Sequence, residues 1–327
     1  MEYFNEDYLI LSEHYAQTME NIVLPFLRQR EKQHPLKGFE DRPLYCVSYP
    51  AEKPRGTVLI VHGFTENAFK YAEIIYSLLQ NSFSVVAYDQ RGHGRSWRKE
   101  GIPDVSLTHV DHFSDYVRDM EIVVDQVLSH FPKPWTLFTH SMGGAVSSLY
   151  LVSHPDVFAR AALCAPMIAP NRNGVPLSGA KLICHSARLA GRGKDRLFAS
   201  KPFNGPEEFS TSCATSKERF DWYDAIKQAR KEFQNNGPSY TWTLESLRVT
   251  KALLASGAPE KIACPVLLFT AEQDNSVLPE EQKAFISRVP KGKQVLVKNA
   301  RHEIFRSEDS VLFPWWRQVL SFLKENP

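Results

Sequence analysis

The sequence has no long hydrophobic run and almost no net charge. No stretch of the chain approaches the roughly 18 consecutive apolar residues that a membrane span needs, so we expect any membrane contact to be peripheral. The N-terminal residues are acidic and lack a sustained apolar segment, which makes a poor signal peptide. The formal net charge of +2 argues against nucleic acid as the main partner.

Cysteine is also scarce. The five cysteines are odd in number and widely spaced, and none forms a C-x-x-C motif, which predicts neither a disulfide framework nor a zinc site. The chain lacks a phosphate-binding Gly-Lys-[Ser/Thr] loop and a cluster of zinc ligands, so we expect no metal and no organic cofactor. Reduced, mostly buried thiols are typical of a cytoplasmic protein, and we expect that location.

The sequence does contain short apolar segments that alternate with longer amphipathic ones. This alternation predicts an α/β fold whose central, mostly parallel sheet is covered by helices. The segment 43–50 alternates polar and apolar residues and predicts an antiparallel edge strand. The other predicted strands lack this alternation and cover 57–64, 83–89, 135–140, 160–167, 265–272 and 293–300.

Helical periodicity occupies the gaps at 66–80, 114–131 and 311–325. The alternation breaks between residues 168 and 258, where Gly, Pro, Ser and Asn are frequent and no convincing buried strand occurs. We therefore expect a core made of residues 1–167 and 259–327. Residues 168–258 are then an insertion that folds over the carboxyl edge of the sheet.

The sequence "THSMGG" places a serine at a tight corner between a predicted strand and a predicted helix. This context resembles the G-x-S-x-G strand–turn–helix signature, in which the serine hydroxyl is exposed as a nucleophile. Gly143 and Gly144 provide room on one side, whereas Thr139 replaces the expected first glycine. The alternative is that Ser141 is only a turn residue or a helix cap.

A serine nucleophile needs a base and a residue that orients the base, in the chain order Ser, Asp or Glu, His. Asp274 follows the predicted strand 265–272, and His302 precedes the last predicted helix, so both fit this order. Taken alone, Asp274 could be a turn former and His302 an ordinary histidine. Asp89 fits less well because it precedes the serine, and Glu272 is expected within its strand.

Ester hydrolysis also needs hydrogen-bond donors for the oxyanion that forms. We expect these to be the backbone amides of Met142, directly after the serine, and of Phe64, in the turn after the first long strand. Gly63 allows that turn, and His62 is interpreted as a residue that braces the loop and has a lesser chance of contacting substrate.

These motifs together resemble those of α/β-hydrolase-fold serine hydrolases of the lysophospholipase L2 and monoacylglycerol lipase-like group. The resemblance runs from about residue 40 to the C-terminus and rests on "VHGFTEN", "YDQRGHGRS", "HSMGG", "GPSYTW", "AEQD" and "NARHEIF". It implies Ser141 as nucleophile, Asp274 as acid and His302 as base. It also implies that residues 168–258 form a lid over the acyl site. Besides Thr139, Ala271 departs from the family pattern, which often has a glycine there.

The predicted lid carries 14 Lys or Arg against 8 Asp or Glu, and its segment 181–201 mixes these cations with apolar residues. Such a segment is typical of a helix on an anionic interface, although a solvated surface explains it as well. We expect the substrate to be a monoacylglycerol or a lysophospholipid. The cations expected to favour a charged head group are Arg188, Arg192, Lys194 and Arg196.

The predicted function is hydrolysis of the ester of a single-chain acyl lipid through an acyl-enzyme. A short-chain carboxylesterase or a peptidase would use the same triad, and only the shape of the lid pocket separates these activities. A binding protein without activity is expected to have lost a triad residue, and this chain has all three.

Overall fold

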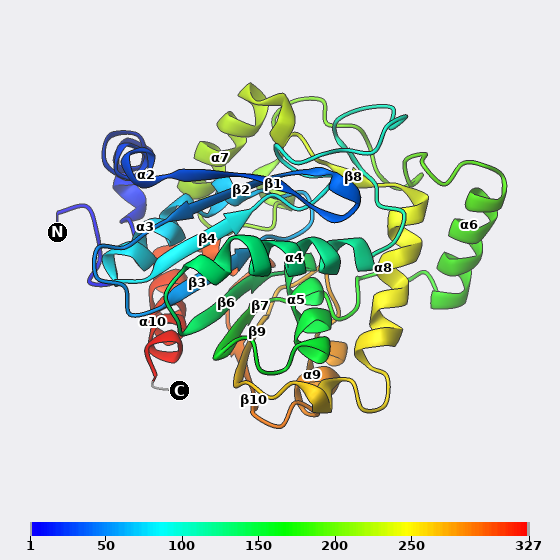
Figure 1. The fold of residues 1–327 in the computed structure, drawn as a ribbon. Helices are drawn as coiled ribbons and strands as arrows, with labels where there is room; N and C mark the ends of the chain where they lie inside the picture. The colour runs from blue at the N-terminus through cyan, green and yellow to red at the C-terminus, as the bar shows by residue number, and fades with distance from the viewer. Residues whose placement is uncertain (1, 326–327) are drawn as a thin grey trace.

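A twisted sheet of eight strands forms the centre of the molecule (Figure 1). The computed structural model describes residues 2–325. The spatial order of the strands is β1-β2-β4-β3-β6-β7-β9-β10. Their bounds are β1 Lys32–Lys37, β2 Pro43–Tyr49, β3 Thr57–Val61, β4 Ser84–Tyr88, β6 Trp135–His140, β7 Arg160–Cys164, β9 Val266–Ala271 and β10 Gly292–Val297.

The neighbouring strands β4, β3, β6, β7, β9 and β10 are parallel, as their unbroken apolar sequences predict. The strand β2 is antiparallel to β4, which confirms its predicted direction, but it is not an edge strand. The edge strand on this side of the sheet is β1, which pairs with β2. The sequence did not indicate this strand. Its sequence, KQHPLK, contains Pro35 and a single buried residue, so it has neither the composition nor the periodicity of a typical strand.

Several predicted strands extended too far at their carboxyl ends. The strand β3 ends at Val61, before the turn that contains Phe64, and β7 ends at Cys164. The backbone leaves the sheet at these points because it forms the loops of the carboxyl edge. In an open α/β sheet these loops make the ligand site.

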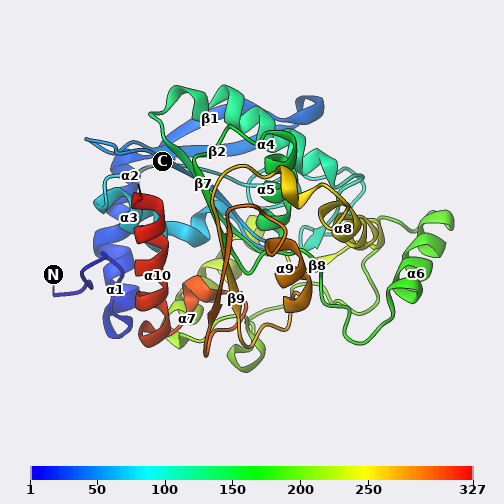
Figure 2. The same ribbon diagram turned by 90° about the horizontal axis from the view of Figure 1, so that it is seen from below.

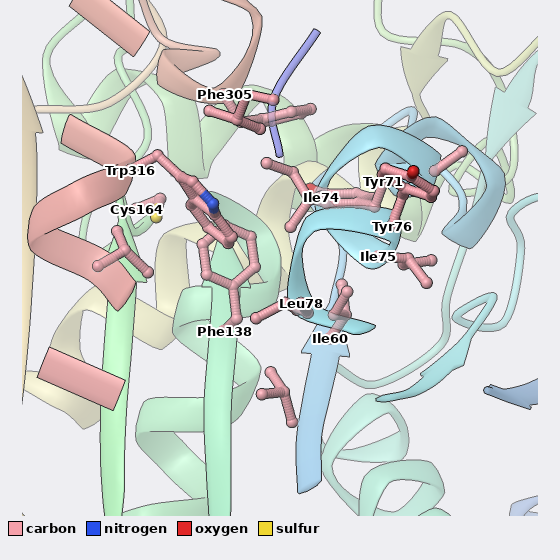
Figure 3. Close-up of a cluster of buried hydrophobic side chains, with 14 of the residues drawn as sticks. Ile60, Tyr71, Ile74, Ile75, Tyr76, Leu78, Phe138, Cys164, Phe305 and Trp316 are labelled. Atoms are coloured by element: carbon pink, nitrogen blue, oxygen red, sulfur yellow. The ribbon is translucent and has the colours of Figure 1, made fainter. Parts of the chain in front are cut away.

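Helices cover both faces of the sheet and enclose two separate hydrophobic clusters (Figures 1 and 2). One cluster lies under α3 and α10, and Figure 3 shows its centre, where Trp316 packs beside Phe138 of β6. The other lies under α4 and α5. The helices of the core are α1 Tyr15–Thr18, α2 Leu24–Arg30, α3 Ala72–Gln80, α4 Ser114–Gln126, α5 Met142–Ser153, α9 Pro279–Ile286 and α10 Asp309–Lys324.

The predicted insertion at 168–258 is mainly helical and joins β7 to β9. It contains α6 Leu177–Leu189, α7 Lys217–Ala229 and α8 Tyr240–Leu253. A two-residue strand, β8 Gly237–Pro238, pairs with β5 Leu107–Thr108 and ties the segment to the core. Both views show α6 standing beyond α8, away from the sheet (Figures 1 and 2).

Candidate active site

Ser141 lies at the sharp turn between β6 and α5. Its backbone has φ 49° and ψ −117°, a conformation that costs a non-glycine residue about 1–3 kcal/mol. Gly143 makes the turn possible because a Cβ at that position would collide with the carbonyl oxygen of Val61. Gly144 is needed for the same reason, since its Cβ would meet Pro166. The structure therefore has the strained strand–turn–helix geometry that the "HSMGG" motif predicts.

The threonine that replaces the first glycine of the motif fits this turn. Thr139 is fully buried on β6, and its hydroxyl oxygen is 3.5 Å from the position that a Cβ on Gly144 would occupy. This separation is an ordinary van der Waals contact, so the threonine fits beside the start of α5 without a clash. The departure at Thr139 does not distort the corner at Ser141.

The structure brings Ser141, His302 and Asp274 together. The Oγ of Ser141 is 2.8 Å from the Nε2 of His302, and the Nδ1 of His302 is 2.7 Å from a carboxylate oxygen of Asp274. All three side chains are at most 6 % exposed. This geometry allows a proton to pass from the serine hydroxyl to the imidazole while the carboxylate stabilises the imidazolium.

Asp274 is held in a loop that follows β9. Its other carboxylate oxygen accepts hydrogen bonds from the backbone amides of Ser276 and Val277, at 2.8 and 3.1 Å. Burial opposes ionisation of this carboxyl group, but the nearby His302 and these hydrogen bonds outweigh it and lower the pKa of Asp274. Asp274 is therefore a carboxylate at neutral pH, as an orienting partner for His302 must be.

The two expected oxyanion donors lie beside the serine. Met142 is the first residue of α5, so its N–H has no intrahelical acceptor. Phe64 follows Gly63, and a Cβ on that glycine would approach the Cβ of Ser141 to 3.1 Å. Within residues 2–325 neither amide donates a hydrogen bond to another group. Both amides are consequently available to a ligand.

The turn at residues 62–63 is held by polar contacts rather than open to substrate. His62 is buried and accepts a hydrogen bond from the amide of Gln90, at 2.9 Å, while its other ring nitrogen lies 2.7 Å from the carbonyl of Gly63. The N–H of Gly63 donates to the carboxylate of Glu66 at 2.6 Å. The interpretation of His62 as a bracing residue agrees with these contacts.

Glu66 is a central residue that sequence reasoning missed. Its carboxylate binds the amide of Gly63, the hydroxyl of Tyr71 at 2.6 Å and the ring of His140 at 3.1 Å. The other ring nitrogen of His140 lies 3.1 Å from the carbonyl oxygen of His302. Glu66 therefore connects the turn at Gly63 to His140, which precedes Ser141, and through His140 to the backbone of His302. The only signal in the sequence was a carboxylate three residues after Gly63.

A buried ion-pair network extends from this carboxylate. Lys70 lies 3.3 Å from Glu66 and 2.5 Å from Glu303, and Glu303 also pairs with Arg306 at 2.5 Å. Burial raises the pKa of both carboxyl groups, but His140 and Lys70 lower that of Glu66 well below its usual range. For Glu303, Lys70 and Arg306 lower it to about 2. The network fixes the backbone next to His302.

Other carboxylates near strand ends have different roles. Both oxygens of Asp89 accept backbone amides, from Ala68 at 2.7 Å and Arg95 at 2.8 Å, so Asp89 closes its own loop. The expectation that Glu272 lies within its strand was wrong, because β9 ends at Ala271 and Glu272 is exposed. Ala271 itself is buried at the end of the strand.

The four cations expected to meet a head group lie at or beyond the end of α6, because this helix ends at Leu189. Arg196 pairs with Asp104 at 3.0 Å and is largely buried. Arg192 pairs with Asp195, and Lys194 donates to the carbonyl of Glu100. Arg188 is exposed in the last turn of the helix. None of the four lines either of the two cavities described next.

Two cavities lie near the site, although neither is lined by Ser141, His302 or Asp274. A polar cavity of about 610 Å³ includes Thr65, next to Phe64, and Glu303, next to His302. A smaller, mostly apolar cavity of about 310 Å³ lies between α6 and α8 and includes Trp242. The Trp242 ring packs against Phe64, with ring centroids 4.1 Å apart. A polar cavity thus includes the chain neighbours of Phe64 and His302, and an apolar cavity includes the tryptophan that packs against Phe64.

The fold and the Ser–His–Asp arrangement are those of an α/β-hydrolase. The family model for serine aminopeptidase, S33, matches residues 52–309, and the chain belongs to this family. Within it, the chain is 31% identical to lysophospholipase L2 of Escherichia coli (strain K12) over 297 residues, which cover 88% of this chain and 85% of that protein.

Two further proteins are similar to this chain. Monoglyceride lipase of Mus musculus is 32% identical over 148 residues, which cover 45% of each chain. The solved structure of a soluble variant of monoglyceride lipase from Saccharomyces cerevisiae superimposes with a TM-score of 0.69 at 19% identity, and the match covers 89% of this chain and 93% of that one. The structural likeness supports the fold.

Proposed function

We propose that this chain hydrolyses the carboxylic ester of a single-chain acyl lipid, a lysophospholipid or a monoacylglycerol. The observation that carries the proposal is the continuous hydrogen-bonded path from Ser141 through His302 to Asp274. The similarity to lysophospholipase L2 and to monoglyceride lipase supports the substrate class.

The proposed reaction has two steps. The Oγ of Ser141 attacks the ester carbonyl carbon while Nε2 of His302 takes its proton, and the amides of Phe64 and Met142 hydrogen-bond the oxyanion. The C–O bond to the alcohol then breaks, and His302 returns the proton to the leaving oxygen. In the second step water, deprotonated by His302, attacks the acyl carbon. The bond from this carbon to Ser141 Oγ breaks, His302 returns the proton to that oxygen, and the fatty acid and free Ser141 are released.

The two cavities suit the two ends of such a substrate. We assign the acyl chain to the apolar cavity between α6 and α8, because Trp242 connects it to Phe64. We assign the head group to the polar cavity, which has charged groups of both signs and could hold a zwitterion. These charged residues are Lys70, Lys201, Lys227, Arg306, Glu207, Glu208 and Glu303.

In this proposal residues 168–258 are the lid, with residues 1–167 and 259–327 as the core. The lid supplies helix α8 and most of the lining of both cavities. A lid of this kind decides which acyl chains reach Ser141, because the triad itself does not distinguish them.

We further propose that α6 and the segment after it touch a membrane surface peripherally. Leu182 is 68% exposed, Leu189 89% and Phe198 71%, and the cations Arg188 and Arg192 lie among them. Exposed apolar side chains next to cations are typical of segments that lie on an anionic lipid interface. Within residues 2–325, none of the helices combines the length and hydrophobicity that membrane crossing requires. A cytoplasmic location, facing the inner leaflet, remains a prediction.

The description of the matching family favours a second candidate, a peptidase that removes N-terminal residues. A short-chain carboxylesterase would likewise use the same triad. Both would leave the 310 Å³ apolar cavity without a long acyl chain to hold.

Side-by-side rates on one enzyme preparation separate these activities. The substrates are a lysophospholipid and a monoacylglycerol with the same acyl chain, nitrophenyl esters of increasing chain length, and an aminoacyl nitroanilide. We expect kcat/KM to rise with chain length and the anilide to be inert. Fastest turnover of the acetyl ester would favour the short-chain esterase, and turnover of the anilide would favour the peptidase.

A further inference from the structure

A third cavity of about 420 Å³ is lined by residues of α2, β2 and α3 and by the residue that ends α7. It shares no lining residue with the polar and apolar cavities near the candidate active site. Its wall combines apolar side chains with three arginines. It therefore has the mixed lining of a ligand site but no connection to the triad.

The three arginines of this cavity are Arg28, Arg95 and Arg230. Within residues 2–325 none of them lies within ion-pair distance of a carboxylate. Buried arginines elsewhere in the protein do form ion pairs: Arg91 pairs with Asp119 at 2.6 Å, and Arg219 pairs with Glu73 at 3.0 Å. The cavity wall thus carries three cationic groups, of which Arg28 and Arg95 are exposed, and none of the three forms an ion pair within residues 2–325.

Aromatic rings hold two of these guanidinium groups in place. Arg95 lies over the rings of Tyr45 and Phe233, at 4.5 and 5.5 Å from their centroids. Arg230 lies over Phe69 and over the same Phe233, at 5.1 and 5.4 Å. Two like charges beside one ring repel each other; water weakens this repulsion at the exposed Arg95, and an anion bound between them would relieve it further. Guanidinium groups stacked in this way keep their N–H groups free for bidentate binding of a carboxylate or phosphate.

The one carboxylate in the cavity does not serve as their partner. The two oxygens of Glu31 accept hydrogen bonds from the hydroxyls of Tyr49, at 2.9 Å, and Tyr45, at 3.5 Å. One of them also binds the side chain of Gln33 at 2.9 Å. Glu31 consequently orients the tyrosines and leaves the arginines unpaired.

The rest of the wall is apolar. Leu24 and Leu27 of α2 face Ala72 and Ile75 of α3 across the cavity lining. A simple inorganic anion would leave this wall in contact with water. An anionic head attached to a hydrocarbon chain would satisfy both halves of the cavity.

We propose that this cavity is a second ligand site, which binds a single-chain amphiphile through an anionic carboxylate or phosphate head. The head lies between Arg95 and Arg230, and the chain lies along α2 and α3. A fatty-acid carboxylate and a lipid phosphate share this chemistry. The site does not depend on hydrolysis at Ser141, because no residue of the triad lines it.

Calorimetric titration of the Ser141→Ala protein tests this site with octanoate, octyl phosphate, octanol and inorganic phosphate. We expect octanoate or octyl phosphate to bind, and octanol and inorganic phosphate to bind at least about tenfold more weakly. The better of the two anionic ligands identifies the head group. Inorganic phosphate binding as tightly as octyl phosphate would overturn the amphiphile site.

Variants of the cavity arginines test directly whether these side chains bind the anionic head. We expect Arg95→Gln/Arg230→Gln to weaken octyl phosphate binding about tenfold or more, since it removes two charge-assisted contacts. The control Arg118→Gln removes a guanidinium that lies over Phe39 at 4.3 Å, outside the cavity, and should leave the affinity unchanged. Equal affinities of the double variant and the control contradict the proposal.

Hydrogen–deuterium exchange gives a second readout that needs no substitution in the cavity. Octyl phosphate added to the Ser141→Ala protein should slow exchange in residues 24–33 and 69–76. Protection confined to residues 168–258 would place the ligand in the lid and overturn the assignment.

Discussion

The residues of the site act through one another, and Glu66 shows this most clearly. A single buried carboxylate holds the amide of Gly63, the ring of His140 and the ammonium group of Lys70. Through these contacts it positions the oxyanion turn and the backbone on both sides of the serine–histidine pair. The strained φ of Ser141 persists because such contacts surround it.

The substitution Asp274→Asn tests whether this carboxylate orients His302. In Asp274→Asn the side chain keeps its shape but donates an N–H toward Nδ1 of His302, which favours the wrong tautomer. We expect kcat to fall about 10³–10⁴-fold while the free energy of unfolding changes little. Steady-state kinetics with a nitrophenyl ester measure this effect.

The exposed Asp221 of α7 provides the matched control for this change. Asp221→Asn should keep full activity. A kcat for Asp274→Asn within threefold of the unmodified protein would show that this carboxylate does not orient the base.

At the scale of elements, the structure divides into a sheet that aligns the triad and helices that shape its surroundings. Ser141 follows β6, Asp274 follows β9 and His302 comes after β10, so parallel pairing brings their loops to one edge. Helices α6 and α8 enclose the apolar cavity near Phe64. In the proposed function the chemistry therefore depends on the core and the specificity on residues 168–258.

Replacing exposed leucines of α6 tests the proposed membrane contact. We expect Leu182→Glu/Leu189→Glu to reduce binding to anionic phospholipid vesicles about tenfold or more, since each leucine buried in lipid contributes about 1.5–3 kcal/mol. Hydrolysis of a water-soluble ester should not change. Vesicle co-flotation measures the binding.

Leu296 of β10 offers a matched control because it is also exposed, at 55%, but lies outside the lid. Leu296→Glu should bind vesicles like the unmodified protein. Equal binding by the α6 variant would show that another surface meets the membrane.

The elements that the sequence predicted well are those whose local pattern agrees with their environment. The strand β6 has its predicted bounds because it is apolar and ends at the "HSMGG" corner. The strand β1 was missed because its pairing with β2 depends on long-range contacts and its own residues are mostly exposed. The helix expected within 181–201 ends at Leu189, because Gly191 and Gly193 follow it.

The same distinction holds for the site residues. Ser141, Asp274 and His302 could be predicted because each follows a strand in a fixed chain order. Glu66 could not, since its role arises only when β3, β6 and the loop of His302 meet. The four basic residues of 188–196 were expected to meet a head group, but charge alone does not tell where a side chain points. Arg196 instead binds Asp104.

At the scale of the whole molecule, buried ion pairs connect distant parts of the chain. Lys70 precedes α3 and pairs with Glu303, which follows His302. The guanidinium of Arg306 donates to Glu303 and to the carbonyl of Arg219 in α7. The network therefore joins the core to the segment 168–258. Breaking it should affect the stability of the complete fold.

The lowered pKa of Glu303 predicts how stability depends on pH. Its pKa is about 2 in the folded protein, against an ordinary value near 4.5, so its stabilising effect is complete above pH 4.5 and is lost as the pH falls toward 2. We expect Glu303→Gln to lower the free energy of unfolding by about 3–5 kcal/mol at pH 7, because it leaves buried cations unpaired, and by less at pH 3.

Urea denaturation at both pH values measures this difference. The exposed Glu280 at the start of α9 is the control, and the effect of Glu280→Gln should be small at both pH values. A Glu303→Gln effect that does not shrink at pH 3 would mean that the ion pairs of Glu303 do not set the acid stability.

The proposed hydrolysis requires the hydroxyl of Ser141 to be the nucleophile that His302 activates. Reaction with a fluorophosphonate, followed by mass spectrometry of the digested protein, tests this directly. We predict one adduct on the peptide that contains Ser141, no adduct in Ser141→Ala, and labelling slowed at least about 10³-fold in His302→Ala. Undiminished labelling of Ser141→Ala, or an adduct on a different residue, would contradict it.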